Sequence, residues 1–274
     1  MKCFYLCPYW GSENLSLEAF LEKVKASGFD GIETWLPVSR QEQQRLKTLL
    51  QQYELLIVCH QYQAAGNTLP QWLDSFQYQL ECCAEMEPLL INSHTGKDYL
   101  MLQEQLQFID RAAVFSEAND ITVAHETHRG NLCYSPYNYA DLLRARNGFP
   151  ITADFSHWTC VTESMLKMQH PILETAIRNA VHIHARVGHE EGPQVPDPRV
   201  PTWRPYLERF VEWWTMIYDH RRRSGSPFLT ITTEFGPPPY MWTSIVDGQP
   251  LASQWELNQF MKDYLNHHFK TRTV

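Results

Sequence analysis

The sequence has few features of a membrane or secreted protein. None of its 274 residues falls in an apolar run approaching the ~20 residues that a membrane-spanning helix needs. The opening Met1-Lys2-Cys3-Phe4 leads straight into an apolar stretch and does not resemble a signal peptide. The seven cysteines are odd in number and include no Cys-x-x-Cys pair, which favours buried thiols over a disulfide framework. We therefore expect a cytoplasmic protein without a membrane partner.

Positive charge is also scarce. The 23 Lys and Arg residues are outnumbered by 31 Asp and Glu, and the formal net charge is −8. Binding to a phosphate backbone depends on clustered Lys and Arg, so we expect no nucleic acid partner. The 12 glycines form no glycine-rich phosphate loop. A small, sugar-like molecule is the favoured partner, and the sequence is compatible with a homo-oligomer without determining the oligomeric state.

The chain does show a regular alternation of short apolar runs and longer amphipathic segments. The runs predict strands at 3–7, 31–35, 55–59, 89–93, 122–126, 150–154, 180–184 and 229–234. Apolar spacing and capping residues predict helices near 16–28, 39–52, 69–85, 100–118, 137–146, 164–178, 203–223 and 253–269. Eight strands alternating with eight helices predict an α/β fold, a (β/α)8 TIM barrel, and residues 1–274 fit a single domain of this kind.

Six consecutive predicted strands end on a side chain that can bind a metal. In chain order these are His60, His94, Glu126, Asp154, His184 and Glu234. The carboxyl ends of the strands form the active site of a TIM barrel. A carboxylate buried there is costly unless it is paired or bound to a cation. We therefore predict that the last four residues hold one divalent metal ion, for which Mn²⁺, Mg²⁺, Co²⁺ and Zn²⁺ all suit the mixed ligands.

Each of these residues also has another interpretation. The three carboxylates could instead form buried ion pairs with an arginine of the barrel. His182 lies two residues before His184 and points the same way on a strand, so either could be the ligand; His184 is nearer the strand end. His60 and His94 could bind the metal or contact the substrate. His125 alternates with Glu126 and is expected to pack outward against a helix. His128 follows Glu126 by two residues and could reach the mouth of the site.

Arginine and tryptophan residues near the predicted strand ends are further candidates. Arg186 lies two residues beyond His184, and Arg199 lies in the long segment 187–202. Either could pair with a nearby acid such as Glu190, Glu191 or Asp197, or could hold a substrate carboxylate or phosphate. Four tryptophans could stack on a sugar or simply pack: Trp10, Trp35, Trp158 and Trp242.

Several short motifs resemble those of the xylose-isomerase-like barrels, the sugar isomerase/epimerase superfamily. They are Gly28-Phe29-Asp30-Gly31-Ile32-Glu33, Asp154-Phe155-Ser156-His157, His182-Ile183-His184 and Thr233-Glu234-Phe235. The resemblance covers nearly the whole chain in order and spacing.

The resemblance extends to the ketose 3-epimerases of this superfamily and implies a mechanism. Residues matching Glu126, Asp154, His184 and Glu234 would hold one metal that binds two oxygens of a keto-sugar. Glu126 and Glu234 would exchange a proton through an enediolate, and the residue matching His157 would contact a substrate oxygen.

The chain also resembles endonuclease IV, which shares the fold and has histidines matching His60 and His94. That enzyme uses an Asp-x-His motif after its seventh strand. Here the corresponding residues are Asp197-Pro198-Arg199, and a guanidinium has no lone pair for a metal. We therefore expect a metal-dependent isomerase or epimerase of a sugar or sugar phosphate. The alternatives are a metal-dependent hydrolase or lyase, either endonuclease-like or a polyol dehydratase, and a non-enzymatic sugar sensor.

Overall fold

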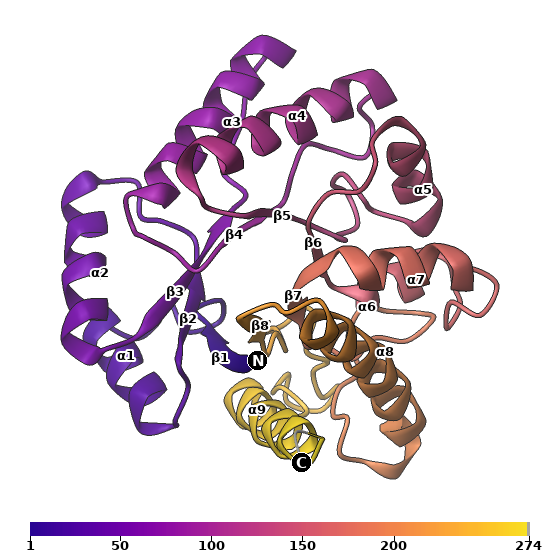
Figure 1. Ribbon diagram of the computed structural model, residues 1–274. Helices are drawn as coiled ribbons and strands as arrows, with labels where there is room; N and C mark the ends of the chain where they lie inside the picture. Colours follow the sequence, from indigo (N-terminus) through magenta and orange to yellow (C-terminus); the bar gives the residue numbers. More distant parts are fainter. Residues whose placement is uncertain (273–274) are drawn as a thin grey trace.

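The computed structural model describes residues 1–272 and contains a closed barrel of parallel strands (Figure 1). The strands follow one another around the ring in chain order. Their bounds are β1 Lys2–Pro8, β2 Gly31–Thr34, β3 Leu56–Gln61, β4 Ile91–Ser93, β5 Val123–Glu126, β6 Ile151–Ala153, β7 Ala180–His184 and β8 Phe228–Thr232. The predicted (β/α)8 TIM barrel is confirmed.

Helices surround the barrel and connect each strand to the next (Figure 1). Ser16, Ser39 and Thr68 cap three of them by accepting a backbone hydrogen bond from the residue three positions later. None of the helices within residues 1–272 has both the length and the apolar character that a membrane-spanning segment needs. Their bounds are α1 Leu17–Ala26, α2 Arg40–Tyr53, α3 Leu69–Ala84, α4 Leu102–Asn119, α5 Pro136–Ala145, α6 Phe155–Val161, α7 His170–Asn179, the 3-10 helix η1 Pro201–Trp203, α8 Arg204–Arg223 and α9 Gln254–Lys270.

The segment between β6 and β7 differs from the prediction. The short helix α6 follows β6 at once, and the helix expected from Ser164 begins only at His170. Seven residues make fewer than two turns, so α6 leaves no apolar period to recognise. Asp154 caps α6 by accepting a hydrogen bond from the Ser156 amide at 3.0 Å. Leu166 has a positive φ of 56°, which is incompatible with a continuous helix from Ser164.

Inward-facing side chains divide the barrel lumen into an apolar part and a polar part. Leu6, Val58, Leu90 and Ala124 form a small buried cluster separate from the large core between barrel and helices. Side chains two residues apart on a strand share a face. The last three are each followed, two positions later, by a polar residue: His60, Asn92 and Glu126. The apolar cluster therefore fills the lumen beneath a polar layer at the carboxyl ends of the strands.

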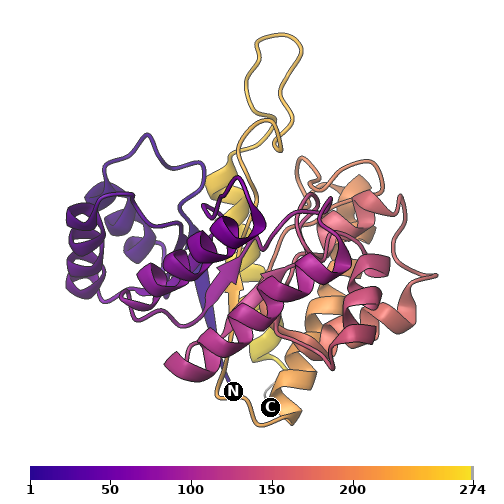
Figure 2. The same ribbon diagram turned by 90° about the horizontal axis from the view of Figure 1, so that it is seen from above.

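The connection between β8 and α9 is a long loop that rises above the barrel (Figure 2). Its arms are joined by an isolated bridge between Thr243 and Pro250 and by a hydrogen bond from the Leu251 amide to the Trp242 carbonyl (2.8 Å). The first half of the loop carries Tyr240.

We predict that Leu6→Ala lowers the free energy of unfolding by about 2–5 kcal/mol, because Leu6 is fully buried and its neighbours in the lumen can collapse only partially. Leu251→Ala is the matched control. That leucine is 53% exposed, so the same change should cost no more than about 0.5 kcal/mol. Urea denaturation followed by circular dichroism measures both. Similar small losses in the two variants would show that the lumen cluster contributes little to stability.

Candidate metal centre

The carboxyl ends of β5 to β8 bring the four predicted metal ligands together. Glu126 ends β5, Asp154 follows β6, His184 ends β7 and Glu234 lies just beyond β8. One ligand atom from each lies within 4.8 Å of the others, and all four residues are buried. With metal–ligand bonds of roughly 2.0–2.2 Å, neighbouring ligand atoms lie about 3–4 Å apart. This spacing suits a single cation.

Three of the four residues direct an unsatisfied atom at this centre. Glu126 Oε1, His184 Nδ1 and Glu234 Oε2 are buried and have no hydrogen-bond partner within residues 1–272. His184 Nδ1 lies 2.7 Å from Glu234 Oε2 and 3.6 Å from Glu126 Oε1, without hydrogen-bond geometry. Buried polar atoms almost always have a partner. Carboxylate oxygens and an imidazole nitrogen that share one point fit a divalent cation.

Asp154 is held by protein partners on both oxygens. Its Oδ1 accepts hydrogen bonds from the Ser156 amide and hydroxyl, and its Oδ2 accepts one from Arg186 Nη2. Arg186 is buried, and its Nη2 also lies 2.8 Å from His157 Nε2 and 3.5 Å from Glu234 Oε2. The ion pair considered from the sequence therefore exists at Asp154. Because a carboxylate oxygen has two lone pairs, Oδ2 can still bind a metal.

Glu33 on β2 is a buried site residue to which the sequence analysis gave no role of its own. Its carboxylate lies on the opposite side of the His184 ring from Glu234, 3.0 Å from His184 Nε2. It also contacts His182 Nε2 at 3.0 Å and accepts from Asn92 Nδ2 at 2.9 Å. A carboxylate in this place orients an imidazole and leaves its other nitrogen for a metal. The sequence feature that could have identified Glu33 is a single acidic residue within a short apolar strand, because a buried carboxylate needs partners.

The grouped carboxylates change the titration of their neighbours. Burial alone would lower the pKa of the His184 imidazole, but three carboxylates raise it well above its usual value: those of Glu234, Glu33 and Glu126. Burial raises the pKa of the Asp154 carboxyl to about 6. The electrostatic field at the centre therefore favours positive charge.

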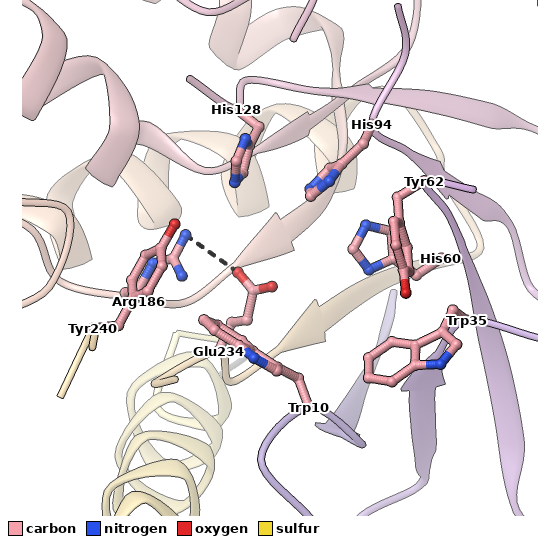
Figure 3. A pocket seen from close by; sticks show the side chains of 9 residues that line it. All are labelled: Trp10, Trp35, His60, Tyr62, His94, His128, Arg186, Glu234 and Tyr240. Carbon is pink, nitrogen blue, oxygen red and sulfur yellow. Dashed lines mark ion pairs between the residues drawn. The ribbon is translucent and has the colours of Figure 1, made fainter. Parts of the chain in front are cut away.

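A cavity of about 250 Å³ adjoins the centre (Figure 3). Glu234 is the member of the four-residue set that lines it. The Glu126 side chain is fully buried, and His94 Nε2 lies 3.0 Å from its Oε2. Figure 3 shows Glu234 between Arg186 and Tyr240 on one side and the His60 and Tyr62 rings on the other. The lining residues are Trp10, Trp35, His60, Tyr62, His94, His128, Arg186, Glu234 and Tyr240.

The predicted substrate contacts divide into two groups. Trp10, His60, His94 and Arg186 lie in the pocket wall, whereas His157 and His182 do not. His157 Nε2 instead contacts Arg186 Nη2 at 2.8 Å. The His182 ring is held within the barrel, with Nε2 beside Glu33 and Nδ1 2.7 Å from Thr230 Oγ1. The pocket residues that the sequence did not single out are Tyr62 and Tyr240, both in irregular segments without a periodic pattern.

Other residues considered from the sequence lie elsewhere. Trp158 is buried and donates to the Cys133 carbonyl at 2.8 Å, and Trp242 packs against His189. His125 Nδ1 lies 2.7 Å from Thr95 Oγ1, and the His125 ring packs against Phe149, as a packing histidine does. The carboxylate of Asp197 accepts hydrogen bonds from the guanidinium of Arg199, and neither residue lines the pocket.

The fold is shared with several solved structures. A probable 3-DHS dehydratase, AsbF of Bacillus anthracis, has a TM-score of 0.61 and 14% identity, over 97% of this chain and 99% of that one. A xylose isomerase-like TIM barrel protein of Mycobacterium smegmatis, in complex with magnesium, has a TM-score of 0.61 and 11% identity, over 94% of each chain. A sugar phosphate isomerase/epimerase of Parabacteroides distasonis has a TM-score of 0.59 and 11% identity, over 96% of this chain and 93% of that one.

Sequence comparison identifies the family. A search of curated proteins gives no match. The family model described as the xylose isomerase-like TIM barrel matches residues 21–204, which is more than half of the chain and spans Glu126, Asp154 and His184. The resemblance seen in the sequence motifs is thereby confirmed, and the chain belongs to the xylose isomerase-like TIM barrel family.

Proposed function

We propose that this chain is a divalent-metal-dependent isomerase or epimerase that moves a proton next to the carbonyl group of a sugar or sugar phosphate. The observation that carries the proposal is the buried cluster of Glu126, Asp154, His184 and Glu234, in which three atoms lack a hydrogen-bond partner within the described residues. Membership of the family and the shared fold with a sugar phosphate isomerase/epimerase support the same class of reaction.

The pocket wall suggests how the protein would take part. A cation held by the four ligands would polarise the substrate carbonyl and so acidify the hydrogen on the neighbouring carbon. Glu234 lines the pocket, so its carboxylate is placed to remove that proton and to return it. As the C–H bond breaks, its electron pair moves toward the carbonyl. Glu126 is covered by His94, so its part in the exchange would pass through that imidazole.

A dehydratase is the second candidate, because a row of imidazoles runs beside the pocket. His60, His94, His128 and His157 follow one another with ring centroids 4.3, 4.2 and 4.0 Å apart. The same proton removal, followed by loss of a hydroxyl group from the next carbon, is a dehydration. Burial lowers the pKa of the His60, His128 and His157 imidazoles, so in the neutral form they would act on that hydroxyl as hydrogen-bond donors. The structural likeness to a probable dehydratase is consistent with this alternative.

Hydrogen exchange tests the reaction class directly. With Mn²⁺ added, we expect deuterium from D₂O to enter at least one ketose of a panel, at the carbon next to the carbonyl, because that proton must leave and return. NMR locates the deuterium and detects products that have lost water, which would favour the dehydratase. Absence of both exchange and water loss across the panel would contradict an enzyme of this class and leave the sugar-sensor alternative.

Substitution of the ligands separates proton transfer from metal binding. We expect Glu234→Gln to lower turnover by roughly 10²–10⁴-fold with metal still bound, because the amide loses the basic lone pair. Asp154→Asn should act mainly through metal affinity, since Asp154 does not line the pocket, and excess metal should restore part of its activity. Turnover and metal content after dialysis measure both effects. If excess metal rescued the two variants equally, Glu234 would be only a ligand.

Glu33→Gln tests the support of His184. We expect metal affinity to fall by about 10–100-fold, because the neutral amide no longer orients and polarises the imidazole. Isothermal titration with Mn²⁺ measures the dissociation constant, and a melting curve verifies folding. Glu54→Gln is the matched control, since the Glu54 side chain is 86% exposed and far from the barrel lumen. Unchanged affinity in a folded Glu33→Gln variant would refute the proposed orienting role.

A further inference from the structure

The pocket beside the metal centre has very little positive charge available for a ligand. Within residues 1–272, no lysine lines it, and Arg186 is its one arginine. A phosphate or carboxylate group bound in a pocket is normally met by free guanidinium or ammonium groups. The pocket can therefore bind an anionic ligand only if the Arg186 guanidinium is not already paired with acidic groups of the protein.

Arg186 is engaged by the protein itself. Its Nη2 donates to Asp154 Oδ2 and lies 3.5 Å from Glu234 Oε2, while its Nε donates to Ser156 Oγ at 3.2 Å. The residue is 1% exposed, and its guanidinium carbon lies 4.9 Å from the centroid of the Tyr240 ring. The charge of this buried guanidinium is therefore offset by carboxylates of the protein itself, through Nη2.

The charges around the centre lead to the same result. Four buried carboxylates lie close together: Glu33, Glu126, Asp154 and Glu234. A divalent cation and Arg186 would supply three positive charges against these four negative ones, since the His184 imidazole is neutral when it binds a cation. A phosphate dianion would therefore enter a site that is already negative, and like charges repel.

The cations near the rim do not change this balance. The exposed Arg129 lies over the Tyr240 ring, 5.4 Å from its centroid, and donates to Cys160 Sγ. Lys97 Nζ donates to Asn131 Oδ1 at 2.9 Å. Neither Arg129 nor Lys97 is part of the pocket lining.

The wall offers instead what a polyhydroxylated molecule needs. His60 Nε2 is buried without a hydrogen-bond partner among the described residues. A hydroxyl group both donates and accepts, so it can satisfy an imidazole nitrogen in either tautomer. The aromatic rings of Trp10, Trp35 and Tyr62 supply apolar surface against which the C–H face of a sugar can lie.

We infer that the pocket takes an uncharged keto-sugar or related polyol and excludes the corresponding phosphate ester, because the one guanidinium that lines it among residues 1–272 is already paired with Asp154. This inference rests on the proposed function for the identity of the reacting centre. It narrows the substrate class from sugars and sugar phosphates to unphosphorylated ones.

Matched pairs of ligands test the inference on the Mn²⁺-loaded protein. D-Fructose is compared with D-fructose 6-phosphate, and D-ribulose with D-ribulose 5-phosphate, at saturating Mn²⁺. Fluorescence of the pocket tryptophans reports binding, and deuterium exchange reports turnover. We expect each parent sugar to bind more tightly than its ester by about tenfold or more. A smaller ratio, a preference for the ester, or binding of neither member of a pair would overturn the inference.

Ligand binding and deuterium exchange distinguish failure of this inference from failure of the proposed function. If no ketose exchanges deuterium, the proposed function fails, while the ratio of affinities still decides whether phosphate is excluded. If exchange occurs but the esters are the better substrates, the proposed function stands and this inference fails.

A substitution at the rim tests charge as the cause. Tyr62 lines the pocket and is 47% exposed, so an arginine there can extend to the bound ligand without burial. We expect Tyr62→Arg to shift the ester-to-sugar affinity ratio toward the ester by about tenfold. Tyr62→Gln is the uncharged control and should leave this ratio near its wild-type value. An unchanged ratio in Tyr62→Arg would show that charge does not exclude the ester, and would overturn the inference.

Discussion

The structure depends on the burial of several carboxylates at one end of a barrel. Glu33, Glu126, Asp154 and Glu234 lie in or just after four different strands, and each is nearly removed from water. Burying a carboxylate without compensation costs far more than a fold can supply. This cost is offset by contacts with the surrounding histidines and with the Arg186 guanidinium, and by the grouping of four of the buried residues as possible metal ligands. A divalent cation would be the most compact way of satisfying it.

The two ends of the ligand cluster are stabilised in different ways. Asp154 has protein partners on both oxygens, through Ser156 and Arg186, so its geometry is fixed by the fold. Glu234 and Glu126 each keep an atom without a hydrogen bond to any described residue, and these atoms face the centre. Of the two, Glu234 also reaches the pocket. One carboxylate is thus anchored, and another is exposed to whatever the pocket binds, which is the arrangement that proton transfer beside a metal requires.

The same charges bear on selectivity. Because Arg186 pairs with Asp154, its charge is offset within the centre, and the rest of the pocket wall consists mainly of imidazoles and aromatic rings. A residue that could have been assigned to phosphate recognition from its type alone is instead part of the centre's own charge balance. The contact partner of a buried arginine, rather than its presence in a pocket, indicates whether it can bind an anion.

Some features of the chain are local and can therefore be predicted from neighbouring residues in the sequence. The alternation of apolar runs and amphipathic segments determined the TIM barrel, because strand and helix periods are written in neighbouring residues. A strand-end rule then sufficed to propose Glu126, Asp154, His184 and Glu234 as a group. Helix α6 escaped detection because it is too short to show a period.

Only the tertiary structure decided which atoms meet. The contact of Glu33 with His184 joins residues 151 positions apart, and the pairing of Arg186 with Asp154 joins residues 32 positions apart. Neither could be read from spacing, since the closed ring places β2 across the lumen from β7 and places β6 beside β7. Tyr240 reaches the pocket through the irregular loop after β8, whose path no periodic pattern encodes. The sequence determined which strands carry polar ends, and closure of the barrel decided their partners.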